Sequence, residues 1–162
     1  MSTYHIEGVA GTGKSTVSED LRKRGYRVVD ADVLCYYGDP KTGEPAEKSP
    51  LNWIWPKSEI LAHITDANGE PLFICGRAMN QDDFEPYFKK TFLLKIDDET
   101  LKYRLATRTN NDYGKHPDDL ALQLKWNAEE LEAARHKGAI VIDATLPPDE
   151  VVTEILRHVQ EG

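Results

Sequence analysis

Eight residues near the start of the chain, Gly8 to Ser15, match the pattern G-x-x-x-x-G-K-[ST], and Thr16 follows them. Glycines at these positions let the backbone turn tightly, so that successive N–H groups converge on a phosphate. Lys14 has the reach to contact β- and γ-phosphates as a catalytic cation, and the Ser15 hydroxyl suits Mg²⁺. The residues expected to bind a nucleotide are Gly8, Gly11, Thr12, Gly13, Lys14, Ser15 and Thr16.

A strand and a helix are expected on the two sides of this loop. Residues 4–7 have the character of a short strand, and residues 15–24 that of a helix that ends at Gly25. A helix N-terminus adds partial positive charge where the phosphate would lie. This setting favours a phosphate-binding loop over the alternative, a chance glycine-rich turn.

Two carboxylates, Asp30 and Asp32, follow the next expected strand at 26–29. A spacing of two places both side chains on the same side of an extended chain. In an open parallel sheet the C-terminal strand ends face the ligand crevice, so both are expected near the phosphate-binding loop. One carboxylate is suited to orient Mg²⁺ through a water molecule, and the other is suited to accept the proton of an attacking hydroxyl. The alternative is that one of them only caps the following helix.

Arg77 and Asn80 follow an apolar run at 71–75 that is typical of a buried parallel strand. Gly76 permits a close backbone approach there, and both side chains are expected to face the crevice and bind substrate. A guanidinium suits a phosphate or a carboxylate; an exposed structural arginine is the alternative. The strand lacks the terminal Asp or Asp-Glu that is typical of motor-type ATPases, which disfavours that class.

Arg104 and Arg108 lie four residues apart on an expected helix over 97–108 and therefore share one face. A polar loop with a glycine follows, and the segment 108–117 is expected to act as a lid. Catalytic arginines that lead into such a loop can neutralise the transferring group and exclude water. The alternative is a solvated basic helix end that the helix dipole favours.

Further strands are expected at 90–96 and within 139–145, and further helices at 57–67, 118–137 and 147–159. The alternation of strands and helices predicts a three-layer α/β fold, with a five-stranded parallel sheet and helices on both faces. Residues 33–70 form an insertion expected to cover a substrate. Its aromatic residues either stack on a substrate ring or pack onto the core: Tyr36, Tyr37, Trp53 and Trp55.

The chain has 162 residues, a formal net charge of −8, 40% hydrophobic residues and 30% charged residues. These values suit one globular domain over 1–162, and the acidic charge disfavours nucleic acid as a partner. No apolar run approaches the roughly 20 residues that span a bilayer. Cys35 and Cys75 lack metal-ligand spacing, which indicates thiols in a reducing cytoplasm. We expect no signal peptide, because the chain enters its first strand directly.

The loop at 8–16, the carboxylates after the second strand and the segment 104–117 together resemble the small P-loop kinases, a group that includes nucleoside monophosphate, shikimate and dephospho-coenzyme A kinases. The resemblance covers nearly the whole chain and implies the strand order 2-3-1-4-5. It also implies that Asp32 meets the acceptor, that Asp30 helps to hold Mg²⁺, and that Arg104 and Arg108 contact phosphates.

Two features depart from these kinases. The turn at Gly76 and Arg77 lacks the triple glycine of shikimate kinases, and residues 33–70 contain no arginine to grip an acceptor monophosphate. This disfavours a nucleoside monophosphate as the acceptor; the alternative is that Arg77 serves in place of such an arginine. The expected function is an ATP- and Mg²⁺-dependent cytoplasmic kinase for a small acceptor, such as a nucleoside, nucleotide or hydroxylated metabolite. The alternative is a regulatory or RNA-processing ATPase of the same fold.

Overall fold

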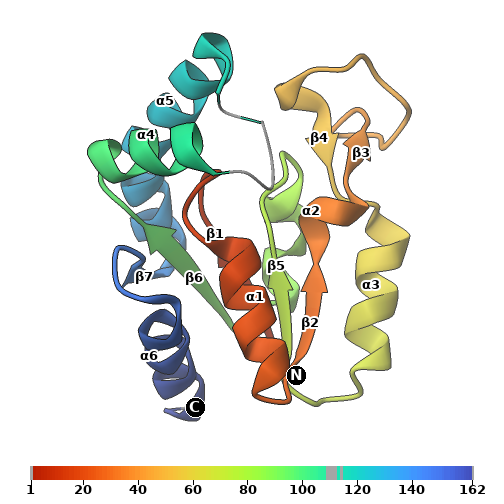
Figure 1. Cartoon of the computed structure of the whole chain (residues 1–162). Helices are drawn as coiled ribbons and strands as arrows, with labels where there is room; N and C mark the ends of the chain where they lie inside the picture. Colours follow the sequence, from red (N-terminus) through yellow and green to blue (C-terminus); the bar gives the residue numbers. More distant parts are fainter. Residues whose placement is uncertain (1, 109–112, 114, 162) are drawn as a thin grey trace.

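The structure, a computed structural model, describes residues 2–108, 113 and 115–161. Its main sheet has five parallel strands in the order β2-β5-β1-β6-β7, drawn in Figure 1. Counted along the chain within this sheet, the order is 2-3-1-4-5, so the prediction is confirmed. The strand bounds are β1 (Thr3–Glu7), β2 (Arg27–Asp30), β5 (Leu72–Cys75), β6 (Lys90–Lys95) and β7 (Ile140–Asp143).

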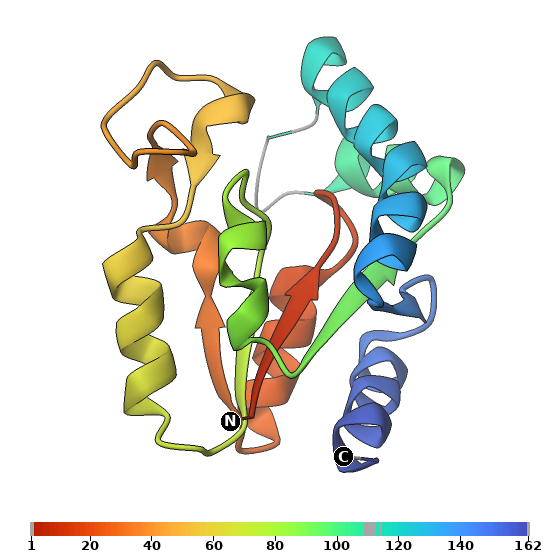
Figure 2. The same ribbon diagram turned by 180° about the vertical axis from the view of Figure 1, so that it is seen from behind.

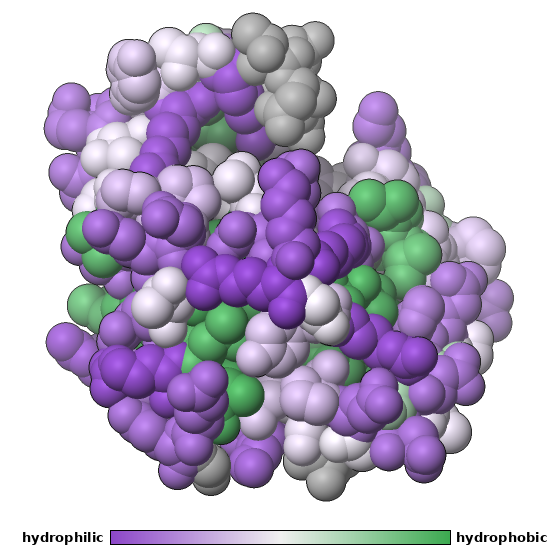
Figure 3. Space-filling view, turned by 60° about the horizontal axis from the view of Figure 1, so that its bottom comes forward, coloured by the Kyte–Doolittle hydropathy of each residue, from purple (hydrophilic) through white to green (hydrophobic). Residues whose placement is uncertain are grey.

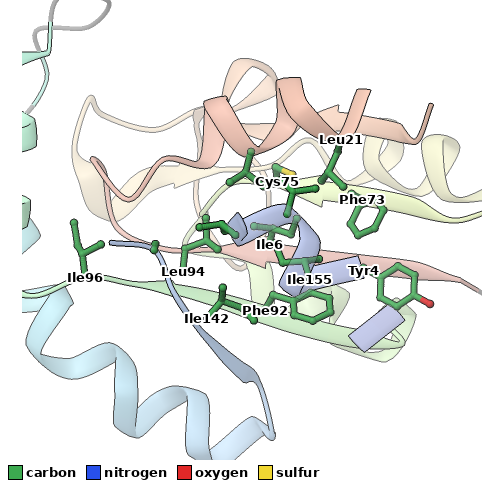
Figure 4. Close-up of a cluster of buried hydrophobic side chains, with 14 of the residues drawn as sticks. Tyr4, Ile6, Leu21, Phe73, Cys75, Phe92, Leu94, Ile96, Ile142 and Ile155 are labelled. Atoms are coloured by element: carbon green, nitrogen blue, oxygen red, sulfur yellow. The ribbon is translucent and has the colours of Figure 1, made fainter. Parts of the chain in front are cut away.

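One face of the sheet packs against α1 (Lys14–Lys23) and α6 (Pro148–Gln160), which lie in front of the strands in Figure 1. Side chains alternate between the two faces of each strand, so Tyr4 and Ile6 of β1 face these helices. Figure 4 shows the resulting cluster of buried side chains. Its labelled members are Tyr4, Ile6, Leu21, Phe73, Cys75, Phe92, Leu94, Ile96, Ile142 and Ile155.

The opposite face carries a second, smaller core. It packs against α3 (Lys57–Asp66) and the 3₁₀ segment η2 (Gln81–Tyr87), which come forward when the molecule is seen from behind (Figure 2). Its buried side chains include Trp55, Ile60, Leu72, Ile74 and Phe84. Helices therefore cover both faces, as the alternation of elements predicts.

Two helices, α4 (Asp98–Thr107) and α5 (Pro117–Lys137), lie near the C-terminal ends of β1, β6 and β7. The Asp97 side chain caps α4 by accepting a hydrogen bond from the backbone N–H of Thr100 at 3.1 Å. Gly138 ends α5 in the left-handed conformation, with φ 70°. Both ends agree with the expected bounds.

The insertion between β2 and β5 contains structure that the sequence analysis did not predict. After the one-turn helix α2 (Ala31–Leu34), the chain forms a small antiparallel hairpin of β3 (Tyr36–Tyr37) and β4 (Trp53–Ile54), with a 3₁₀ turn, η1 (Pro50–Asn52), before its second strand. Strands of two residues are too short to show an alternating pattern. Between the two strands, an isolated antiparallel bridge joins Gly38 and Pro45.

The surface seen in Figure 3 is mainly hydrophilic, with separate hydrophobic patches. Within the described residues, no helix combines the length and the apolar character that a membrane crossing requires.

Candidate active site

A cleft of about 800 Å³ opens where the C-terminal strand ends meet α4, α5 and the hairpin. This volume lies in the range of ligand pockets, about 300–1,000 Å³. Residues from all these elements line it, although they are far apart in the sequence. The expected site residues that line the cleft are Gly8, Gly11, Thr12, Gly13, Lys14, Ser15, Thr16, Asp30, Asp32, Arg77, Arg104 and Arg108.

The loop between β1 and α1 depends on glycine for both conformation and space. Gly11 and Gly13 have φ 86° and 95°, which L-residues with a side chain rarely adopt. At Gly8, a Cβ atom would lie 2.9 Å from the carbonyl oxygen of Leu94. Thr12 is buried, and its hydroxyl donates to the Val9 carbonyl at 2.9 Å. The loop therefore has one well-defined path around the N-terminus of α1.

The Lys14 side chain lies across this loop. Its ammonium donates to the carbonyl oxygens of Gly8 and Val9 at 2.5 and 3.1 Å. Burial lowers the pKa of Lys14, while the nearby Asp32 carboxylate opposes that shift. A phosphate oxygen in the loop would offer the ammonium a stronger, charged acceptor than these carbonyls.

Asp30 and Asp32 both line the cleft, but they belong to different elements. Asp30 is the last residue of β2, and Asp32 lies in α2, so an extended chain does not explain their proximity. Burial first, and then the charge of Asp32, raise the pKa of Asp30. The Asp30 side chain makes no capping hydrogen bond to α2, so the capping alternative does not apply to it.

Asp32 is anchored to the exit of β5. Its Oδ1 atom accepts a hydrogen bond from the backbone N–H of Arg77 at 3.0 Å. Gly76 makes this approach possible, because a Cβ atom there would lie 2.7 Å from the same oxygen. The close approach that was predicted at Gly76 is therefore an approach of the Asp32 carboxylate to the backbone at Gly76 and Arg77.

The Arg77 side chain lines the cleft between two residues of α5. Its Nη1 atom donates to Glu130 Oε1 at 2.8 Å, and its guanidinium carbon lies 4.8 Å from the centre of the Trp126 ring. The second Glu130 oxygen, Oε2, is buried without a hydrogen bond. Burial raises the pKa of Glu130 to about 7, against the attraction of Arg77, Lys95 and Lys14.

The two arginines near the end of α4 occupy different positions in the cleft. Arg104 donates to the carbonyl oxygens of Gly11 at 3.4 Å and Ala144 at 2.9 Å. It thereby links the phosphate-binding loop to the exit of β7. Arg108 donates to the Tyr113 carbonyl, its Nε atom is buried without a partner, and burial lowers its pKa. Neither is a freely solvated cation at a helix end.

The expectation that Asn80 faces the crevice needs correction. Asn80 is only 9% exposed and does not line the cleft. Its amide oxygen accepts from the backbone N–H of Trp55 at 2.9 Å, and its amide nitrogen donates to the Trp55 carbonyl at 3.0 Å. Asn80 therefore takes the place of a backbone partner for Trp55.

The four aromatic residues of the insertion divide into two pairs. Trp55 is fully buried in the second core, and the Tyr36 hydroxyl donates to the Gly43 carbonyl at 2.7 Å, so both support the insertion itself. Tyr37 and Trp53 line the cleft, with ring centres 5.1 Å apart. Tyr36 and Tyr37 are neighbours in β3 and therefore point to opposite faces, whereas Trp55 lies beyond the end of β4.

Helix α5 contributes polar groups that the sequence analysis did not single out as functional. Gln123 is 3% exposed; its side-chain oxygen accepts from the backbone N–H of Ala10 at 2.9 Å, and its nitrogen donates to the Tyr113 hydroxyl at 2.9 Å. Asn127 and Glu130 are also buried. The spacing 123, 127 and 130 places them on one face of the helix. This polar stripe was the signal in the sequence that could have indicated their place at the site.

Half of the expected lid at 108–117, namely 109–112 and 114, lies outside the described residues, so the lid stays a prediction. Within the described part of the chain, no group of three or more His, Cys, Asp or Glu side chains forms a metal cluster.

A parallel sheet in the order 2-3-1-4-5, with a glycine-rich loop between β1 and α1, defines the P-loop class of nucleotide-binding proteins. A family model described as an AAA domain matches residues 5–135. The match covers most of the chain, so the protein belongs to the AAA domain family. A search of curated proteins finds no match.

Solved structures of small kinases share the fold over nearly the whole chain. A gluconokinase from Sinorhizobium meliloti is 19% identical, with TM-score 0.61 and coverage of 99% of this chain and 92% of that one. A deoxyadenosine kinase from M. mycoides is 17% identical, with TM-score 0.58 and coverage of 99% and 100%. A shikimate kinase from Bacteroides thetaiotaomicron is 14% identical, with TM-score 0.62 and coverage of 98% of each chain. At these identities the likeness is one of fold.

Proposed function

We propose that this protein is an ATP-dependent phosphotransferase that moves the γ-phosphoryl group of ATP to a hydroxyl of a small molecule. The observation that carries the proposal is that the phosphate-binding loop and Asp32 line one cleft. Phosphoryl transfer depends mainly on positioning and on the stabilisation of charge. The cleft offers both, through the loop N–H groups and the cations Lys14, Arg104 and Arg108.

In the proposed reaction, the acceptor hydroxyl oxygen forms a new bond to the γ-phosphorus, and the bond from that phosphorus to the β,γ-bridging oxygen breaks. Asp32 accepts the hydroxyl proton, and ADP leaves with the bridging oxygen. The hydrogen bond that Asp32 accepts from the backbone N–H of Arg77 orients its carboxylate for this role. The Lys14 ammonium stabilises the negative charge that develops on the phosphate oxygens.

The residues that would hold Mg²⁺ are Ser15 and Asp30. A hydroxyl and a carboxylate suit this ion, which usually takes one or two protein ligands together with phosphates and water. Both residues line the cleft. Burial first, and then the nearby Asp32 carboxylate, raise the pKa of Asp30, so a cation there would relieve repulsion. When bound, Mg²⁺ would neutralise charge on the phosphate groups.

The rest of the chain fits the same proposal. Residues 1–162 would form one kinase domain, with the insertion 33–70 over the acceptor and the segment 108–117 as the lid. Cys35 and Cys75 are free thiols, and burial raises the pKa of both, so they suit a reducing cytoplasm better than redox chemistry. The net charge of −8 disfavours nucleic acid as the acceptor.

Incubation of the protein with γ-labelled ATP and a panel of small hydroxylated acceptors tests the proposal. We expect label to appear on an acceptor, and Lys14→Ala to abolish the transfer while the fold survives. Lys23→Ala is the matched control, because Lys23 is an exposed lysine of the same helix. Label that moves only to water would favour the regulatory or RNA-processing ATPase, and transfer retained in Lys14→Ala would contradict the role of the loop.

A further inference from the structure

The cleft differs in chemistry between its two ends. One end is formed by the phosphate-binding loop, by charged side chains at the end of α4, and by Ala144, Leu146, Pro148 and Val151 at the exit of β7 and the start of α6. The other end lies beyond Asp32, between the hairpin and the exit of β5. Its lining is mostly apolar or aromatic: Val33, Tyr37, Pro50, Trp53, Met79 and Trp126. The second end is where an acceptor would lie in the proposed reaction.

Tyr37 and Trp53 lie on neighbouring strands of the hairpin, with ring centres 5.1 Å apart. Both are half-buried, and neither belongs to the two hydrophobic cores. Val33 and Met79 are 77% and 40% exposed. Exposed apolar side chains gathered in a cleft mark a binding surface more often than a structural one, and aromatic rings favour a planar ligand.

The cation at this end of the cleft is already compensated. Arg77 pairs with Glu130 at 2.8 Å and lies over Trp126. The other cationic side chains in the described lining are Lys14, Arg104 and Arg108, which come from the phosphate-binding loop, from α4 and from the residue directly after α4. Asp30 and Asp32 add negative charge beside the acceptor. An anionic acceptor would therefore lose its hydration and meet repulsion without gaining a free cation.

We infer that the acceptor is an uncharged molecule with a planar ring and a free hydroxyl, of which nucleosides are the chemical class, and that Glu130 disfavours anionic acceptors by neutralising Arg77. The ring would stack in the aromatic part of the cleft, and the hydroxyl would point at Asp32. This inference rests on the proposed phosphotransferase activity and adds the class of acceptor.

The first test compares acceptors that differ in charge at pH 8, where Glu130 is ionised. The panel holds purine and pyrimidine nucleosides, and the matched pairs uridine with 5-carboxyuridine and glucose with glucuronate. We expect kcat/KM to be at least about 100-fold higher for the best nucleoside than for any carboxylate, and the nucleosides to exceed glucose. Equal or faster transfer to a carboxylate overturns the inference alone. Absence of transfer to every acceptor overturns the proposed function.

The second test changes the charge of Glu130. Glu130→Gln keeps the shape of the side chain and leaves the Arg77 charge uncompensated, so the ratio of kcat/KM for 5-carboxyuridine to that for uridine should rise at least about 10-fold. An unchanged ratio in a folded variant contradicts the role of Glu130.

The wild-type protein supplies the same test without a substitution. Burial raises the pKa of Glu130 to about 7, and the charged groups that act on this pKa are Arg77, Lys95 and Lys14, which lower it, and Glu7, which raises it. Between pH 8 and pH 6 Glu130 gains a proton, while both acceptors keep their charge. The same kcat/KM ratio should therefore rise as the pH falls, and a flat ratio contradicts the inference even if Glu130→Gln does not fold.

The third test addresses the aromatic part of the cleft. Trp53→Ala should raise KM for a nucleoside at least about 10-fold, with a smaller change in kcat, and Trp53→Phe should restore most of the affinity. Leu51→Ala is the control, since Leu51 is 58% exposed, two residues away, and outside the lining of the cleft. Equal KM values for Trp53→Ala and Leu51→Ala would overturn the stacking role.

Discussion

The Oδ1 atom of Asp32 accepts a hydrogen bond from the backbone N–H of Arg77 at 3.0 Å, although 45 positions separate the two residues in the sequence. The bond joins α2, which directly follows β2, to the exit of β5, and these two strands are neighbours in the sheet. It requires glycine at position 76, where φ is 147° and a Cβ atom would lie 2.7 Å from the carboxylate oxygen and 3.0 Å from the Asp32 nitrogen. The glycine that follows β5 thus allows the position of the Asp32 carboxylate, which follows β2.

Gly76→Ala should reduce both stability and transfer, because the new methyl group collides with Asp32. We expect a loss of more than about 2 kcal/mol in the free energy of unfolding, from backbone strain and steric overlap together, and a fall in kcat of at least about 10-fold. Urea denaturation and steady-state assays with the acceptor found in the panel measure the two effects.

Gly69→Ala is the matched control for this substitution. Gly69 also has a positive φ, 86°, but a Cβ atom there would meet nothing within 4 Å beyond its own chain neighbours. It should cost only the backbone strain, about 1–2 kcal/mol, and leave kcat unchanged. Similar losses of kcat in the two variants would show that strain, and not contact with Asp32, is responsible.

Arg104→Ala should weaken nucleotide binding. Its guanidinium joins the carbonyls of Gly11 and Ala144, and its loss should loosen the loop that receives the phosphates. We expect Kd for a fluorescent ATP analogue to rise about 10-fold, which corresponds to about 1.4 kcal/mol. The control is Arg24→Ala, since Arg24 also donates to two groups but joins α1 to α6 away from the cleft. An equal Kd for the two variants would contradict the prediction.

Asn80→Ala should act on stability and not on substrate binding. The substitution leaves the backbone N–H and C=O of Trp55 without their partners inside the protein, which costs about 2–4 kcal/mol. KM for the acceptor should stay within about 2-fold. Asn52→Ala removes one exposed hydrogen bond, to the Glu47 carbonyl, and should cost less than about 1 kcal/mol. A large rise in KM for Asn80→Ala would contradict this prediction and indicate that Asn80 binds the substrate.

The stability of the protein should depend on pH through Glu130. Burial raises the pKa of this carboxyl from 4.5 to about 7 in the folded chain, so the folded state binds more protons than the unfolded state between those values. The contribution of this group therefore falls as pH rises from about 4.5 to about 7. Relative to Glu130→Gln, the wild-type protein should lose about 2–3 kcal/mol of unfolding free energy across this range. Parallel pH profiles for the two proteins would contradict this.

The local parts of the site follow from short stretches of sequence. The loop from Gly8 to Thr16 is a turn between one strand and one helix, and its glycines act on their own backbone. The order of the sheet follows from the regular alternation of strands and helices, because right-handed crossovers leave few arrangements. The strand-end positions of Asp30 and Arg77 could be predicted for the same reason.

Side-chain partners across the sheet could not be predicted in this way. Asn80 follows a strand end, as a crevice residue would, yet the hairpin brings the Trp55 backbone to it. Tyr36 and Tyr37 are adjacent and chemically alike, and the pleat of a two-residue strand alone decides that Tyr37 lines the cleft. Glu130 lies mid-helix, where its charge suggests a solvated position until α5 is placed against the sheet.

The sequence by itself determined that a phosphate chain can bind at the end of β1 and that carboxylates and arginines follow the neighbouring elements. These features depend on contacts within a few residues and on the direction of parallel strands. Only the tertiary structure decided that Asp32 bonds to Arg77, that Arg77 pairs with Glu130, and that Asn80 turns inward. Each of these depends on the distance between side chains that are remote in sequence, and packing of whole elements sets that distance.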